Sequence, residues 1–376
     1  MVIDRRSFCR LLGTAAFMAA VSGRAMAQGT VRDMLGREVA LTQAPRRIVL
    51  LDARDILSMA LLHPDPASLV VGWASVDMFD SDLLRRQYEV RGDGQPIAIV
   101  GSRTADTVSA EKIIALEPDL VVATAFMVPD LAKSDLVRRL ESAGVPVVFS
   151  NVTSNIPSDV AYDPFADLGT TMALWGGILG NATKAQDFTG FVLGRRDRLK
   201  ARLAGTMPVK TYLEIQSTSD DCCWVAGNRL WGDLLTLAGG KTLSAVTAPW
   251  YAKLGVEQLL IEEPAVYIAS GGDFAASGRP AIGPGLSVDK TQDGFRQLVS
   301  RTGFEGVPAV QGRRVHGVWT GLIAVPFLNI LFVEAAARWL HPGLTQDIDP
   351  AATLDEINRR FLAKPIPGPC WATYSF

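Results

Sequence analysis

The feature that most constrains the fold is a unit that occurs twice in the chain. The first copy is EKIIALEPDLVVA at residues 111–123, and the second is EQLLIEEPAVYIA at residues 257–269. In each copy a short helix pattern ends at a proline, and an apolar strand pattern follows directly. Gly-Val-Pro comes after each copy, at 144–146 and 306–308. Helix, proline and strand often alternate in parallel sheets, but matches in the same order favour two related α/β halves over coincidence.

A long amphipathic segment, residues 181–204, lies between the two copies. Asn181 can cap a helix here, and four apolar residues recur near the helical period: Phe188, Val192, Leu199 and Leu203. At about 1.5 Å per residue such a helix would span roughly 36 Å, about the width of a small domain. A shorter helix pattern, Pro164 to Leu179, leads into it. The segment is therefore predicted to join the two halves.

Strand patterns alternate with helix patterns on both sides of this segment. A hairpin is expected at 30–41, and buried strands are expected at 47–51, 69–72, 97–100, 120–123, 145–149, 210–215, 265–269 and 314–319. The expected fold class is α/β, with two Rossmann-like lobes whose sheets are parallel. We place the lobes at residues 28–163 and 205–376, joined by a single long α-helix within a linking helical segment, residues 164–204.

Residues 1–27 have the pattern of an export signal. Arg5 and Arg6 precede an apolar run, Leu11 to Val21, and the stretch ends in Ala-Met-Ala at 25–27. The run is too short to cross a bilayer, so we expect twin-arginine export to the periplasm and cleavage before Gln28. Its removal takes the formal charge from −2 to −5, because it carries four arginines and one aspartate. A nucleic-acid partner is not expected.

Three cysteines remain in the mature chain: Cys222, Cys223 and Cys370. An oxidising compartment favours one disulfide, and the longer-range choice joins Cys370 to one of the adjacent pair. The sequence lacks C-x-x-C, G-x-S-x-G, H-E-x-x-H and P-loop patterns and has only three histidines. We therefore expect neither an enzyme nor a zinc site.

These pieces, in their order and spacing, resemble the helix-linked (class III) substrate-binding proteins of bacterial ABC importers for iron-siderophores, haem and cobalamin. The resemblance covers residues 30–363. It is carried by the Asp33-x-x-Gly36-Arg37 hairpin with Pro45 to Val49, the two repeated units, the central helix and Ala238-Gly239-Gly240. It implies a periplasmic protein, expected to be monomeric, that holds ligand in a shallow cleft outside the carboxyl ends of both sheets. It also implies delivery to an ABC permease in the inner membrane, with small rocking of the lobes.

The resemblance suggests ligand residues at strand ends. Arg103, in Gly-Ser-Arg-Thr at 101–104, matches a similar motif of hydroxamate-siderophore binders, although it could instead pair with Asp106 at the surface. Aromatic residues at strand ends suit a large, partly apolar ligand, but each could equally belong to the core: Trp73, Phe126, Trp224, Trp250, Tyr251 and Trp319. Phe126 departs from the tyrosine that hydroxamate binders tend to have there.

The ligand expected first is a preassembled anionic Fe(III) chelate, a ferric siderophore, with no cofactor or metal site belonging to the protein itself. The histidines stand where structural roles are more common, so the chelator is expected to hold the iron. Haem is the second choice, with Tyr251 as the best axial candidate, and cobalamin is the third. A sensor or adaptor that binds only a partner protein stays open.

Glu111 and Glu257 occupy matching positions at the start of the helix in each repeated unit. The family uses one such carboxylate on each lobe to meet arginines of the permease, so the resemblance implies docking roles for both. Each could also simply complement its helix dipole, a contribution of about 0.3–1 kcal/mol.

Overall fold

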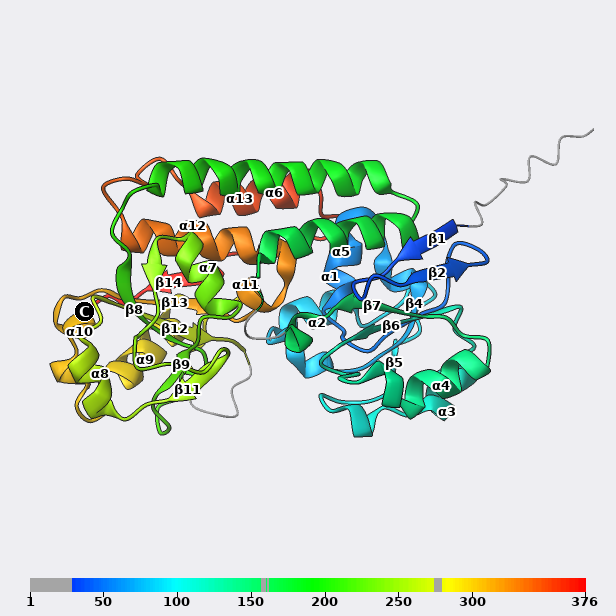
Figure 1. Ribbon diagram of the computed structural model, residues 1–376, viewed down its shortest axis with the longest axis horizontal. Helices are drawn as coiled ribbons and strands as arrows, with labels where there is room; N and C mark the ends of the chain where they lie inside the picture. The colour runs from blue at the N-terminus through cyan, green and yellow to red at the C-terminus, as the bar shows by residue number, and fades with distance from the viewer. Residues whose placement is uncertain (1–28, 157–159, 161, 274–278) are drawn as a thin grey trace, which may run out of the picture.

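The protein is described by a computed structural model that covers residues 29–156, 160, 162–273 and 279–376. Two lobes lie side by side beneath one long helix (Figure 1). The export signal expected at residues 1–27 lies outside the described residues. In the described part of the chain, no helix combines the length and the apolar character needed to span a membrane.

The described chain opens with an antiparallel hairpin of β1 (Gly29–Arg32) and β2 (Glu38–Leu41). Asp33 holds its turn, because the carboxylate accepts the backbone N–H groups of Leu35 and Arg37 and two guanidinium N–H groups of Arg37. The guanidinium of Arg37 also donates to the carbonyl of Val147 at 2.8 Å. The hairpin is thereby fixed to the first lobe.

The first lobe contains a five-stranded sheet in the order β5-β4-β3-β6-β7, and every neighbouring pair is parallel. Its strands are β3 (Ile48–Leu50), β4 (Val70–Trp73), β5 (Ala98–Ile99), β6 (Leu120–Thr124) and β7 (Val147–Asn151). Its helices are α1 (Asp55–Leu62), α2 (Asp82–Tyr88), α3 (Ala110–Ala115) and α4 (Asp135–Ser142). The central strands are buried on both faces, as continuous apolar runs predict.

The second lobe contains a mixed seven-stranded sheet in the order β11-β9-β8-β12-β13-β14, with β10 also paired to β8. Its strands are β8 (Val209–Glu214), β9 (Trp224–Ala226), β10 (Gly240–Lys241), β11 (Tyr251–Lys253), β12 (Val266–Gly271), β13 (Val315–Trp319) and β14 (Trp371–Thr373). Its helices are α7 (Trp231–Leu237), α8 (Val256–Glu262), α9 (Val288–Val299), α10 (Pro308–Gln311), α11 (Gly321–Ala324), α12 (Asn329–Leu340) and α13 (Pro350–Arg360).

The centre of this second sheet, β8, β12 and β13, is parallel as expected, whereas β9, β11 and β14 are antiparallel to their neighbours. The parallel pairing expected from the sequence is therefore complete in the first sheet and limited to the central strands of the second. Parallel neighbouring strands need a long crossover connection, usually a helix. The segment between β8 and β9 contains no helix, so β9 pairs with β8 in the antiparallel direction.

The repeated units form equivalent structures in the two lobes. α3 leads to β6 in the first lobe and α8 leads to β12 in the second. In both, the glutamate before the proline has a left-handed backbone, with φ +46° at Glu117 and +49° at Glu263. A residue before proline avoids the right-handed α region, so neither helix can continue through its glutamate. The same left-handed turn therefore follows both helices.

The linking helices are α5 (Pro164–Ile178) and α6 (Ala182–Leu203), and α6 runs across both lobes with α12 and α13 below it (Figure 1). The apolar positions of α6 identified in the sequence are buried. Phe188 contacts the rings of Phe327 and Phe361 edge-on, at centroid distances of 5.9 and 5.0 Å. Asn181 stands at the N-cap position but makes no capping bond; its Nδ2 donates to the carbonyl of Leu62 at 2.9 Å.

The lobes also meet at Asp80, which follows a short 3₁₀ helix of the first lobe. Its backbone carbonyl accepts the indole N–H of Trp319 at 2.9 Å, and its carboxylate accepts the hydroxyl of Thr320 and pairs with Arg279 at 3.1 Å. A polar bridge therefore joins the lobes in addition to the helices.

Candidate functional site

A cavity of about 570 Å³ lies between the two lobes. The first lobe contributes residues that follow β3, β6 and β7, and α5 contributes Asp167 and Thr171. The second lobe contributes Ile215 after β8, Leu230 and Trp231 at α7, and residues around β11 and the start of α12. The cavity thus lies at the carboxyl ends of central strands, where open α/β sheets bind ligands.

Among the described residues, five aromatic side chains line this cavity: Phe126, Tyr162, Trp231, Trp250 and Tyr251. Phe126 is 56% exposed and Tyr251 is 52% exposed, which is unusual for large apolar groups. Trp224 packs behind Tyr251 with the rings edge-on at 5.7 Å, so the tyrosine ring is supported from outside the cavity. Exposed aromatic surface of this kind is typical of a ligand wall.

The polar side of the cavity includes Asp52, Arg54 and Asp55 at the end of β3. Arg54 donates to Asp52 through its backbone N–H at 3.0 Å and through Nε at 2.9 Å. Asp55 accepts the Ser150 hydroxyl at 2.6 Å. Burial, with the nearby charge of Asp52, raises the pKa of Asp55 to about 8, against the opposing effects of Ser150 and Arg54.

Asp167 and Tyr162 continue the polar side from α5 and the segment before it. The Tyr162 hydroxyl lies 3.3 Å from that of Thr153 and hydrogen-bonds the carboxyl group of Asp167. Burial raises the pKa of Asp167 above its usual range. Its Oδ2 is buried, and no donor among the described residues reaches it. The cavity therefore combines apolar aromatic walls with buried carboxyl groups, and one carboxyl oxygen, Oδ2 of Asp167, has no donor among the described residues.

Residues 60–318, more than half of the chain, match the family model for periplasmic binding proteins. The chain belongs to the periplasmic binding protein family. No curated protein matches the sequence closely enough to count as a relative.

Solved structures show which branch of the family shares the fold. The TroA-like periplasmic binding protein FepB from Veillonella parvula is 20% identical, with a TM-score of 0.79 over 92% of this chain and 99% of that one. The molybdate-binding protein MolA from Haemophilus influenzae is 18% identical, with a TM-score of 0.69 over 90% and 98%. A periplasmic haem-binding protein from Pseudomonas aeruginosa is 19% identical, with a TM-score of 0.58 over 88% and 99%. This periplasmic binding protein therefore shares the helix-linked fold of the TroA-like structure, as expected from the sequence.

Three of the residues singled out in the sequence of this binding protein line the cavity: Phe126, Trp250 and Tyr251. Trp224 lies one layer behind, where its indole N–H donates to Asp221 at 3.0 Å. Trp73 and Trp319 are 3% and 0% exposed and belong to the core. Trp73 is the last residue of β4, and Trp319 is the last residue of β13. Because the inward face of each strand packs on the core, a position at the strand end did not bring either side chain to the cleft.

Arg103 also lies outside the cavity wall. It is largely exposed and forms an ion pair with Asp77, not with the Asp106 considered in the sequence. The cation on the wall is Arg54. Sequence reasoning missed Arg54, Asp55, Tyr162, Asp167 and Trp231, although Asp-Ala-Arg-Asp at 52–55 directly follows a predicted strand, the signal that led to Arg103.

Glu111 and Glu257 are exposed and stand in the first turns of α3 and α8, away from the cavity. Glu111 pairs with Arg139 and accepts the Ser109 hydroxyl at 3.1 Å. Its pKa is lowered by a backbone hydrogen bond and by Arg139. Figure 1 shows α3 and α8 at the lower side of the two lobes, opposite α6. The two carboxylates thus lie on the same side of the molecule, one on each lobe.

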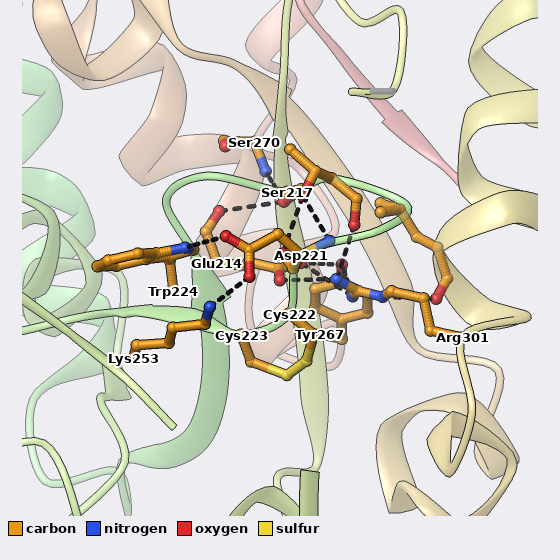
Figure 2. A network of polar contacts seen from close by, with 12 residues as sticks. Glu214, Ser217, Asp221, Cys222, Cys223, Trp224, Lys253, Tyr267, Ser270 and Arg301 are labelled. Atoms are coloured by element: carbon orange, nitrogen blue, oxygen red, sulfur yellow. Dashed lines mark hydrogen bonds and ion pairs between the residues drawn. A yellow bond between two sulfur atoms is a disulfide. The ribbon is translucent and has the colours of Figure 1, made fainter. Parts of the chain in front are cut away.

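The cysteine pairing differs from the longer-range choice. The disulfide joins the neighbours Cys222 and Cys223 (Figure 2). Cys370 is a buried thiol, and burial raises its pKa to about 12. Cys223 precedes β9 and Cys370 precedes β14, and β8, β12 and β13 separate these strands. At about 4.8 Å per strand they stand roughly 19 Å apart, too far for a disulfide.

Next to the disulfide lies a buried polar network (Figure 2). Glu214 accepts two hydrogen bonds from Arg301, at 2.9 and 3.0 Å, and one from the Tyr267 hydroxyl. Among the described residues, Glu214, Cys222 and Cys223 form the one group of acidic, histidine or cysteine side chains close enough to share a metal ion. Since the sulfurs are bonded to each other and the carboxylate is paired with Arg301, this group is already engaged.

Proposed function

We propose that this binding protein captures an organic iron chelate, a ferric siderophore as first choice, and delivers it to an ABC permease. The observation that carries the proposal is the inter-lobe cavity with its aromatic wall. Its volume of about 570 Å³ lies within the range of roughly 300–1,000 Å³ that is typical of small-molecule sites.

The placement of the histidines supports a chelate whose iron is held by the chelator. His316 stacks on Trp339 at 4.5 Å, and burial lowers its pKa to about 3. His341 lies 2.9 Å from the carbonyl of Gly239, and His63 accepts the backbone N–H of Asp65 at 3.1 Å. All three have structural partners, and none lines the cavity.

Haem is the second candidate, because Tyr251 presents a phenol on the cavity wall. The haem-binding protein from P. aeruginosa shares the fold, which is compatible with this alternative. Cobalamin and a role as a sensor or adaptor for a partner protein are lower choices, since no observation favours either.

The route to the permease completes the proposal. We propose export by the twin-arginine signal at 1–27, lobes at 28–163 and 205–376, a linking segment at 164–204, and permease contacts at Glu111 and Glu257. Replacement of Arg5 and Arg6 by lysine should leave precursor in the cytoplasm, and an unchanged periplasmic yield would contradict the assigned route.

The test is a tryptophan-quenching titration with ferric hydroxamate, catecholate and carboxylate siderophores, haemin and cobalamin. Trp231 and Trp250 lie on the wall, so a bound iron chelate should quench them. Trp250→Ala should weaken binding, whereas Arg103→Ala, outside the cavity, should leave it unchanged. A haemin Soret shift that disappears in Tyr251→Phe would replace the siderophore by haem.

A further inference from the structure

The polar side of the cavity is rich in hydrogen-bond acceptors and poor in free cations. Asp52, Asp55 and Asp167 contribute three carboxyl groups, and Arg54 is the one lysine or arginine among the described lining residues. The guanidinium of Arg54 is already held by Asp52 through two hydrogen bonds. No described lysine or arginine lies within ion-pair distance of Asp55 or Asp167. An anionic ligand would therefore meet carboxyl groups and, among the described lining residues, no lysine or arginine that is not already held by a carboxylate.

Asp55 and Asp167 border the same part of the cavity. Ser150 connects them, because its hydroxyl donates to Asp55 at 2.6 Å and its carbonyl accepts the hydroxyl of Thr171 at 3.5 Å. Thr171 is one turn after Asp167 on α5, so the two side chains share a helix face. A ligand that fills the cavity can therefore contact both carboxyl groups.

Asn329 adds a third acceptor from the second lobe. It lines the cavity and is only 2% exposed. Both of its side-chain N–H groups are used, since Nδ2 donates to the carbonyls of Leu322 and Ile323 at 3.0 and 2.9 Å. No described donor reaches its Oδ1. An amide oxygen on a cavity wall can accept a hydrogen bond from a ligand donor.

The aromatic wall suits the same ligand chemistry. Faces of tryptophan, tyrosine and phenylalanine attract cations through the negative potential over the ring. Trp231, Trp250 and Tyr251 lie on the second-lobe side, across from the carboxyl groups of the first lobe and α5. A cation in the cavity can therefore contact carboxyl oxygens on one side and aromatic rings on the other.

A bare metal ion does not explain these groups. Among the described residues, the three cavity aspartates do not form a cluster with ligand atoms close enough to share an ion. The acceptors are spread over a cavity of about 570 Å³, a volume that fits an organic molecule.

We infer that the cleft selects a positively charged organic ligand, so that the captured iron chelate carries a protonated amine bound beside Asp55 and Asp167. The inference rests on the proposed function and narrows it. It also replaces the anionic chelate expected from the sequence, an expectation based on Arg103 being in the cleft.

The experiment compares ferric complexes of one linear trihydroxamate in three forms: with a terminal primary amine, with that amine acetylated, and with it succinylated. Their charges are positive, neutral and negative, while the iron centre is unchanged. A ferric tricatecholate is the anionic comparison from another class. The wild-type protein should bind the amine form at least about tenfold more tightly than the acetylated form, as a charge-assisted hydrogen bond would give.

Asp55→Asn and Asp167→Asn should each reduce this preference, with little change in affinity for the acetylated form. Asp187→Asn, on the exposed face of α6, is the matched control and should keep the preference. Circular dichroism checks that each variant is folded, and the wild-type comparison does not depend on any variant.

Equal binding of the three trihydroxamates, or tighter binding of the tricatecholate, would overturn the inference and leave the proposed function standing. A preference that persists in both aspartate variants would also overturn it. Failure of every iron chelate to bind would overturn the proposed siderophore function, and the inference with it.

Discussion

Glu214 and Arg301 illustrate how single residues stabilise the second lobe. Both side chains are buried, and their charges are paired by two hydrogen bonds, with Tyr267 as a third partner of the carboxylate. The ring of Phe304 lies 4.0 Å from the guanidinium. A buried pair of this kind is costly to break because the remaining charge loses its partner.

Arg301→Gln should therefore lower the free energy of unfolding by about 3–5 kcal/mol, measured by urea denaturation. The matched control is Arg296→Gln, because Arg296 pairs with Asp293 at the surface. That change should cost less than about 1 kcal/mol. Equal losses in the two variants would contradict the importance assigned to the buried pair.

The raised pKa of Asp55 has a consequence for stability. The folded state keeps the proton up to about pH 8, whereas the unfolded chain releases it near the ordinary aspartate pKa of 3.8. The folded state thus binds more protons between these values, so this group's contribution to stability falls as pH rises through the window. Burial and the charge of Asp52 raise the pKa, Ser150 and Arg54 lower it, and these three residues are all kept in the test.

Asp55→Asn should remove this contribution. Thermal unfolding from pH 5 to pH 9 should show a smaller loss of stability in the variant than in the wild type, so that the variant gains relative stability at high pH. Asp187→Asn should follow the wild type. Parallel curves for Asp55→Asn and the wild type would mean that Asp55 is not protonated in the folded protein.

At the scale of elements, the sequence predicted the parallel first sheet, the long helix and the repeated units, because each has a local apolar period. The antiparallel edges of the second sheet have no such local signal, since strand direction depends on the partner. The aromatic residues show the same limit: Phe126 and Trp73 both follow strand patterns, yet Phe126 lines the cavity and Trp73 is buried. Which way a strand-end side chain points depends on the packing of the whole lobe.

The apolar period of α6 predicts that one face of the helix is buried, but it does not predict which residues of the C-terminal region pack against that face. Phe188→Ala should lower the free energy of unfolding by about 3–5 kcal/mol, because it removes a ring packed against Phe327 and Phe361. Phe376→Ala, at an exposed phenylalanine, is the control and should cost under about 1 kcal/mol. Chemical denaturation measures both, and a small loss at Phe188 would show that α6 is not an essential part of the core.

At the scale of the molecule, the two lobes present equivalent glutamates on the side opposite α6. If they contact the permease, Glu111→Lys or Glu257→Lys should abolish uptake while ligand affinity in solution stays within about twofold, because neither residue lines the cavity. Glu305→Lys, at another exposed acidic position of the second lobe, is the control for charge and should keep uptake. Lost ligand binding in either docking variant would contradict this separation of roles.

The bridge from Asp80 to Trp319 provides an optical reporter of lobe separation. The indole is fully buried, and its N–H is bonded to a carbonyl of the other lobe, so any opening at this point would hydrate the ring. Hydration shifts indole emission to longer wavelengths, whereas a chelate in the cavity lowers intensity at Trp231 and Trp250. One emission spectrum thus separates two events: its intensity follows occupancy, and its wavelength follows the distance between the lobes.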